Sequence, residues 1–164
     1  AHNNLANAFH ELGLLDEAVA SYHEALDINP DYSGAHYNLG NVLKDLGRLE
    51  ESIVHYQKAL AIQPDLAEGH INLGLTLQEL GRLEEAIKHC RKAIAIKPDL
   101  PEAQYNLGVT LLNAGQHKEG LKYTPQRGKV LEVTSLTKEL IALIALFCNI
   151  QVQMIFLLYL GILS

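Results

Sequence analysis

Asparagine side chains recur along the sequence at a regular interval, and amides in such a row could bind a polypeptide. They come directly before a Leu-Ala or Leu-Gly pair or three positions later, at Asn4, Asn7, Asn38, Asn41, Asn72 and Asn106. Each amide has a donor and an acceptor, so a column of them can pair with successive peptide groups of an extended chain. The alternative role is structural, with each amide bonding only its neighbours or water.

Carboxylates follow seven residues after three of these asparagines, at Glu11, Asp45 and Glu79. Such a row would repel an anionic peptide and favour a neutral or basic one. The alternative is a solvated row of charges that binds nothing. Acids near the C-terminal end of a helix oppose the helix dipole at a cost of roughly 0.3 to 1 kcal/mol each, which argues against a purely structural origin.

The histidines and cysteines do not predict a metal site. His70 follows His36, and His89 follows His55, at the same interval as the asparagines. If each interval is one helical hairpin, equivalent positions lie on the order of 10 Å or more apart, whereas zinc ligands lie about 2 Å from one ion. Cys90 takes the place of an aromatic residue and is expected to be a small buried hydrophobe. We therefore predict no metal and no cofactor.

Catalytic motifs are also missing from the sequence. It has no Gly-rich phosphate loop after a strand and no nucleophile in a recognisable elbow. The acidic residues are spread along the repeated segments, and no pocket in which they converge is predicted. We therefore expect that the chain is not an enzyme.

A repeated segment predicts the elements that position these side chains. Aligning residues 33–66 with residues 67–100 gives 20 identities in 34 positions without a gap. Turn and stop signals recur at the same interval, at Gly13, Gly47, Gly81 and Gly115 and at Pro30, Pro64 and Pro98. Each glycine allows a tight turn between two helices, and each proline ends a helix.

Each repeat has the apolar spacing of two helices. The first carries a stripe at His36, Leu39, Gly40 and Leu43 and should end near Gly47, while the second buries Leu49, Ile53, Tyr56, Ala59, Leu60 and Ile62. Small residues occupy the positions where the two helices should approach closely, such as Gly40 with Ser52 and Gly74 with Ala86. The sequence therefore predicts a row of helical hairpins.

These hairpins resemble the tetratricopeptide repeat. Residues 33–66 meet that family's pattern through His36, Leu39, Gly40, Leu43, Ser52, Tyr56 and Pro64. The resemblance implies an all-α fold, a right-handed superhelical solenoid of antiparallel helix pairs with about three and a half units. The units are residues 1–32, 33–66, 67–100 and the partial unit 101–123, which together form a domain of residues 1–123.

The resemblance also implies a function in binding, because the first helices of such solenoids line a concave groove that usually holds an extended peptide. The asparagine column is similar to that of the superhelical arm of O-GlcNAc transferase, which holds substrate peptides through such a ladder. The predicted function is a non-catalytic protein interaction scaffold. One alternative is the substrate-binding arm of an O-GlcNAc-transferase-like glycosyltransferase.

Net charge narrows the class of partner. The chain of 164 residues has a net charge of −6, and residues 1–123 carry 17 acidic and 10 basic residues. An acidic solenoid repels phosphate backbones, so we expect no nucleic acid partner. Two cysteines cannot form a disulfide framework, which favours a cytoplasmic protein. Because the sequence opens on Ala1 within a helical pattern, it is expected to be a piece of a longer protein.

The tail of residues 124–164 does not repeat and ends in an apolar helical segment. Residues 140–163 carry no charge, and a helix of that length spans roughly 36 Å, enough to cross a bilayer core. One interpretation is therefore a tail-anchored membrane adaptor with cytoplasmic repeats. A second is a helix over residues 130–147 that covers the last unit. A third is that the tail is not a selected sequence and arises from a shifted reading frame.

Overall fold

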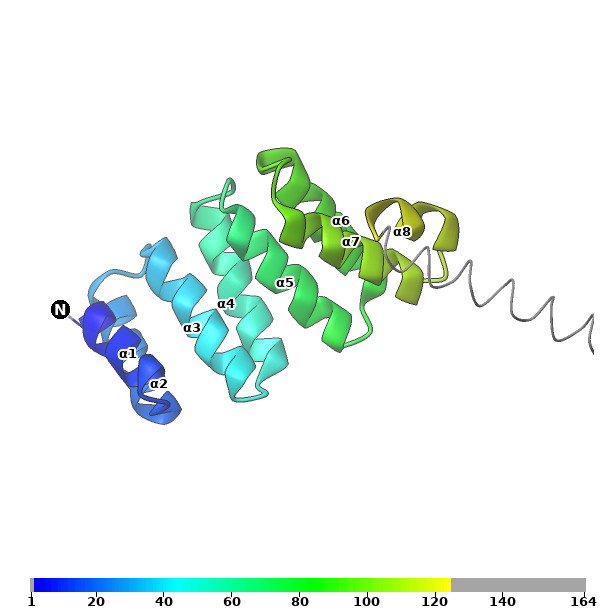
Figure 1. Ribbon diagram of the computed structural model, residues 1–164. Helices are drawn as coiled ribbons and strands as arrows, with labels where there is room; N and C mark the ends of the chain where they lie inside the picture. Colours follow the sequence, from blue (N-terminus) through cyan, green and yellow to red (C-terminus); the bar gives the residue numbers. More distant parts are fainter. Residues whose placement is uncertain (1, 125–164) are drawn as a thin grey trace, which may run out of the picture. The chain divides into compact units, whose positions relative to one another are not determined.

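The computed structural model describes residues 2–124, in which every regular element is an α-helix (Figure 1). The helices are α1 (His2–Glu11), α2 (Leu15–Ile28), α3 (Ser33–Asp45), α4 (Leu49–Ile62), α5 (Ala67–Glu79), α6 (Leu83–Ile96), α7 (Pro101–Asn113) and α8 (His117–Tyr123). They form four successive antiparallel pairs, so the predicted all-α fold of helix pairs is confirmed.

Most of the predicted tail lies outside the described residues. The expectations for residues 130–147 and for the apolar segment 140–163 concern this part of the chain. Within residues 2–124, no helix combines the length and the apolar character that crossing a membrane requires.

A glycine in the left-handed region makes the sharp turn between the two helices of a pair. Gly47 has a φ of 73°. Its N–H donates to the Lys44 carbonyl at 2.9 Å, and the next N–H, of Arg48, donates to the Leu43 carbonyl at 2.8 Å. This pair of bonds is the Schellman motif, which satisfies carbonyls at the end of α3 before α4 begins. The same conformation recurs at Gly13, Gly81 and Gly115.

Proline separates one pair from the next. The N–H of Gln63 still donates to the Ala59 carbonyl at 2.8 Å, but α4 has ended at Ile62. Pro64 cannot donate the next helical bond, and its ring disfavours helical geometry in the residue before it. The following helix then begins at Ala67.

The helices form two layers, and their spacing curves the stack. The first helices of successive pairs contact one another, α1 with α3, α3 with α5 and α5 with α7. The backbones of the second helices α2, α4, α6 and α8 approach first helices but not each other within the described residues, and only side chains such as Arg91 and Glu119 connect second helices. Because the first helices are closer together, the stack bends toward them. We call their exposed side the inner face and the side of the second helices the outer face.

A large buried ring and a missing side chain hold the pair α3 and α4 together. Tyr56 on α4 is fully buried, and a Cβ added to Gly40 on α3 would lie 2.6 Å from the Tyr56 ring. Ser52, also buried, donates its hydroxyl to the Gly40 carbonyl at 2.8 Å. Only glycine therefore lets α3 and α4 approach this closely around the ring.

The fourth pair is shorter than the other three. Helix α8 has 7 residues, whereas α2, α4 and α6 have 14 each. Gly120 on α8 packs against Gly108 on α7, and the Thr124 hydroxyl donates to the Gly120 carbonyl at 3.1 Å. The early end of α8 agrees with the loss of the repeat pattern around Gly120.

Candidate functional site

The asparagines of the inner face are joined from one repeat to the next by hydrogen bonds. Asn38 on α3 donates from Nδ2 to Oδ1 of Asn7 on α1 at 3.1 Å. The same Oδ1 accepts a second bond from the hydroxyl of Tyr22 on α2. One amide thus ties together α1, α2 and α3.

The next junction has the same arrangement at the equivalent positions. Asn72 on α5 donates from Nδ2 to Oδ1 of Asn41 on α3 at 2.9 Å and lies 3.0 Å from the Tyr37 hydroxyl. The hydroxyl of Tyr56 on α4 donates to the same Oδ1 of Asn41 at 2.7 Å. Burial raises the pKa of Tyr22 to about 12 and also raises the pKa of Tyr56, so both hydroxyls keep their protons and remain donors at neutral pH.

The third junction lacks this bond. The position of Asn7 and Asn41 is occupied by Leu75, and the position of the two tyrosines by Cys90. Asn106 on α7 is 8% exposed, and its Nδ2 has no hydrogen-bond partner among the described residues. Cys90 is buried, as expected, and burial raises the pKa of its thiol to about 11.

The bonds between repeats leave part of each amide for a ligand. Oδ1 of Asn7 and of Asn41 accepts two bonds, while Nδ2 of each donates to no other described residue. Asn38 and Asn72 use Nδ2 as a donor, and no described group donates to their Oδ1. Because tyrosine fixes which end of the amide faces inward, the free N–H groups of Asn7 and Asn41 are held in one orientation. Such preorganisation lowers the entropy cost of binding.

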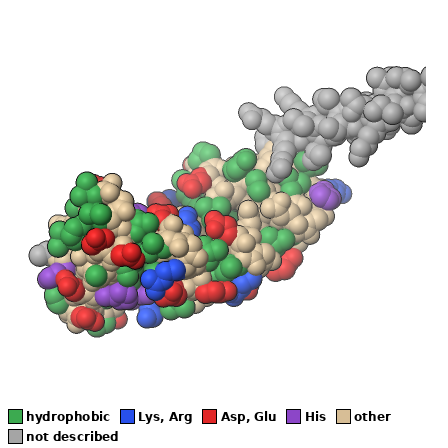
Figure 2. Space-filling model, turned by 90° about the horizontal axis from the view of Figure 1, so that it is seen from below, with side chains coloured by type: hydrophobic (Ala, Val, Ile, Leu, Met, Phe, Trp, Pro, Cys, Tyr) green, Lys and Arg blue, Asp and Glu red, His purple; other side chains and the backbone are tan. Residues whose placement is uncertain are grey.

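The remaining predicted site residues differ in their surroundings. Asn4 on α1, Glu11 at the end of α1 and Glu79 at the end of α5 are exposed. Asp45 at the end of α3 is also exposed, but its Oδ2 lies 2.8 Å from Nε2 of His10. The acids therefore do not form a uniform row, because the Asp45 carboxylate already has the His10 imidazole as a hydrogen-bond partner. Figure 2 shows red acidic side chains interspersed with blue Lys and Arg along the face it displays.

Two histidine pairs were not foreseen from the sequence. Nδ1 of His36 lies 3.0 Å from Nδ1 of His55, and Nδ1 of His70 lies 2.9 Å from Nδ1 of His89. Each pair joins the two helices of one repeat, whereas the sequence comparison considered only equivalent positions of successive repeats. The sequence did contain a signal for these pairs, because His36 and His55 recur together as His70 and His89 in the next repeat.

The hydrogen bonds of these pairs fix their tautomers. Nε2 of His70 bonds to the Pro64 carbonyl at 3.2 Å and must carry a proton there. Nδ1 of His70 is then an acceptor, so Nδ1 of His89 is the donor and Nε2 of His89 is unprotonated at neutral pH. Within residues 2–124, no three metal-ligating side chains converge on one point.

Comparisons with known proteins agree with this geometry. A family model described as TPR repeat matches residues 6–47, 40–81 and 77–115. No curated protein matches the sequence. Among solved structures, the chain is similar to a MamA protein at 25% identity and a TM-score of 0.73, covering 76% of this chain and 68% of that one.

Two further solved structures are described by what they bind. YrrB, described as a TPR protein with an unusual peptide-binding site, is 26% identical with a TM-score of 0.69, covering 74% of this chain and 63% of that one. The first TPR of Spaghetti (RPAP3), solved with the HSP90 peptide SRMEEVD, is 20% identical with a TM-score of 0.68. That match covers 70% of this chain and 90% of that one and bears on the fold alone.

Proposed function

Because the chain belongs to the tetratricopeptide repeat family, we propose that it is a non-catalytic scaffold that holds an extended peptide of a partner protein along its inner face. The observation that carries this proposal is the fixed orientation of the amides of Asn7 and Asn41, whose Nδ2 groups remain for a ligand. The description of YrrB as a protein with a peptide-binding site supports the same class of function.

The geometry favours binding through the peptide backbone. Asn7 and Asn41 would donate to carbonyls of the partner, while Oδ1 of Asn38 and of Asn72 would accept from its N–H groups. Asn4 is the exposed counterpart of Asn38 and Asn72 in the first repeat and adds one amide to this row. Asn106 is buried and would contribute less than the sequence predicts. Such contacts depend little on the partner's side chains.

The acids set the charge preference of the proposed site. Glu11 and Glu79 are exposed, and no described residue forms an ion pair with either carboxylate. They would attract a basic peptide and repel an acidic one, by about 0.2 to 1 kcal/mol per exposed charge pair. Asp45 contributes less, because its Oδ2 already lies 2.8 Å from Nε2 of His10. The proposed partner is therefore a neutral or basic extended segment.

A peptide-binding experiment tests this function on the full chain. Asn41→Asp keeps an acceptor for Tyr56 and Asn72 but removes the Nδ2 donor, so we expect it to bind a neutral extended peptide about twofold to tenfold more weakly. Glu79→Lys should weaken a basic version of that peptide by about twofold to fivefold at low salt. Fluorescence anisotropy with a labelled peptide library measures both affinities.

Matched variants separate these effects from changes in net charge. Asn29→Asp and Glu17→Lys make the same changes away from the inner face and should leave both affinities unchanged. Equal affinities for the wild-type chain and Asn41→Asp would disprove backbone binding by the amide. Unchanged binding of the basic peptide to Glu79→Lys would disprove the charge preference.

The two alternatives from the sequence depend on residues beyond those described. A glycosyltransferase arm requires a catalytic domain encoded next to these repeats, and reading the gene in all three frames tests for it. A tail-anchored adaptor requires insertion of residues 140–163, and membrane pelleting that resists carbonate tests for it.

A further inference from the structure

The outer face carries two grooves that are copies of one another. The first outer groove, of about 670 Å³, lies between α2 and α4, and the second outer groove, of about 510 Å³, lies between α4 and α6. Both exist because the backbones of successive second helices do not approach each other closely. His55 and Lys58 line the first groove, and the equivalent His89 and Lys92 line the second.

The two grooves are lined by equivalent parts of successive repeats but differ in charge. Asp27 and Asp31 line the first groove beside Lys58. In the second groove the position of Asp27 is occupied by Ala61, no acidic residue lines the wall, and Lys88 adds a second cation. The same shape is thus mixed in charge in one copy and basic in the other.

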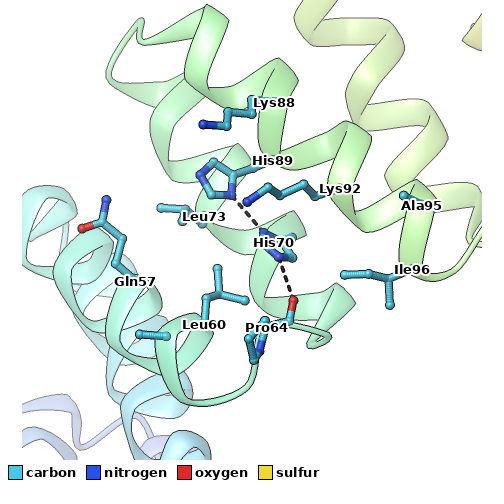
Figure 3. Close-up of a pocket in the computed structure, with 11 residues that line it drawn as sticks. Gln57, Leu60, Pro64, His70, Leu73, Lys88, His89, Lys92, Ala95 and Ile96 are labelled. Carbon is cyan, nitrogen blue, oxygen red and sulfur yellow. Dashed lines mark hydrogen bonds between the residues drawn. The ribbon is translucent and has the colours of Figure 1, made fainter.

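The two lysines of the second groove have no acidic partner of their own. Neither Lys88 nor Lys92 forms a salt bridge with another described residue. The nearby Glu85 holds Arg82 through bonds of 2.7 and 2.8 Å, which commits both of its carboxylate oxygens. Figure 3 shows both ammonium groups pointing toward the space between α4 and α6. A basic groove without counter-charges on an acidic chain is complementary to an anion.

The floor of the second groove is apolar and ends at the histidine pair. Leu60, Leu73 and Ile96 line it, and His89 is on the same wall as the two lysines (Figure 3). A groove with an apolar floor and cations along one wall suits a segment that carries both carboxylate and aliphatic side chains. A bare inorganic anion would leave the apolar floor uncovered.

We propose that the second outer groove binds a short acidic segment of a partner protein, with a carboxylate at Lys88 and Lys92 and an aliphatic side chain against Leu60 and Ile96. This site lies on the opposite face from the peptide site proposed above and has the opposite charge preference. The chain would then hold a basic segment on its inner face and an acidic one on its outer face.

Acid should strengthen this binding through the histidine next to the lysines. The groups that face His89 are His70 on α5 and Lys88, Lys92 and Glu85 on α6. Burial, together with His70 and the two lysines, lowers the pKa of His89 to about 4. A bound carboxylate would favour the imidazolium, so binding takes up a proton at Nε2 of His89 and tightens as the pH falls.

Fluorescence anisotropy tests the proposal by measuring the affinity of the full chain for two labelled peptides. One is the acidic peptide Ser-Glu-Leu-Glu-Leu-Ser, and the other is a neutral version with Gln in place of each Glu. The acidic peptide should bind more tightly than the neutral one, and more tightly at pH 5.5 than at pH 7.5. The double variant Lys88→Glu/Lys92→Glu should bind the acidic peptide about tenfold more weakly. Lys58→Glu in the first outer groove is the matched control and should change the affinity less than about twofold.

The possible outcomes distinguish the sites and the occupants. Unchanged affinity of Lys88→Glu/Lys92→Glu, or an equal loss for Lys58→Glu, would overturn the proposal. The double variant could instead bind both peptides with wild-type affinity but sediment differently from the wild-type chain. The occupant of the groove would then be a second copy of the chain, and this result would also overturn the proposal. Glu79→Lys changes only the inner face, so its effect on the basic peptide is read independently. Thermal unfolding by circular dichroism verifies that each variant is folded.

Discussion

The amide of Asn106 should contribute less to stability than its counterpart one repeat earlier. Asn72→Ala removes bonds to Asn41 and Tyr37, so we expect the free energy of unfolding to fall by about 1 to 2 kcal/mol. Asn106→Ala removes a buried Nδ2 without a described partner and should cost less than about 0.5 kcal/mol. Urea unfolding of both variants measures the difference. Equal costs would show that the bond between Asn72 and Asn41 does not stabilise the stack.

Residue roles were only partly predictable from the sequence. The regular interval between repeats placed the asparagines on one face. Which amide atoms bond to a neighbouring asparagine depends on tyrosine rings 15 residues away in the sequence. A signal was nevertheless present, because tyrosine and asparagine disappear together where Cys90 and Leu75 stand. The histidine pairs could not be predicted from the repeat interval, because each pair joins the two helices within one repeat.

At the scale of elements, the distance between the paired helices α3 and α4 depends on one glycine, Gly40. Gly40→Ala places a Cβ 2.6 Å from the ring of Tyr56, which is buried and hydrogen-bonded and cannot move aside, so we expect a loss of about 1 to 3 kcal/mol. Gly74→Ala meets Cys90 Sγ at 3.2 Å and the Ala86 carbonyl oxygen at 3.4 Å, and it gains helix propensity, so it should cost clearly less than Gly40→Ala. Denaturant unfolding compares the two, and a similar loss in both would contradict the role given to the ring.

The elements themselves follow from local chemistry, which explains why they could be predicted. Glycine at a φ of 73° and proline after a helix act within a few residues, so Gly47 and Pro64 fix the ends of α3 and α4 whatever the rest of the chain does. The curvature of the stack could not be predicted in this way. It depends on contacts between first helices of different repeats.

For the whole molecule, the histidine pairs make stability depend on pH. Burial, with smaller effects from neighbouring cations, lowers the pKa of His55 and of His89 to about 4, while the unfolded value is about 6.5. The unfolded chain therefore binds more protons between these values. The stabilisation is complete above about pH 6.5 and is lost as the pH falls toward about 4. We expect a loss on the order of 1 kcal/mol per pair between pH 7 and pH 5.

Urea unfolding at the two pH values measures this dependence. His55→Gln/His89→Gln should flatten it, because glutamine does not titrate and can still donate to the partner ring. His117→Gln on α8, where the ring is exposed, is the control and should leave the slope unchanged. An unaltered slope in the double variant would assign the pH dependence to other groups.

The junction between α5 and α7 differs from the two before it, because Leu75 stands where they have an asparagine. At the first two junctions one amide oxygen accepts two bonds. At the third, Oγ1 of Thr110 on α7 lies 2.6 Å from Oε1 of Gln78 on α5, and Nδ2 of Asn106 has no partner among the described residues. Heat or a pulling force would open such a row from one end, because the hairpin of α7 and α8 has the shorter second helix, with 7 residues in α8. Most of the proposed peptide site on the inner face lies on α1, α3 and α5. It would therefore remain folded if the hairpin of α7 and α8 unfolded first.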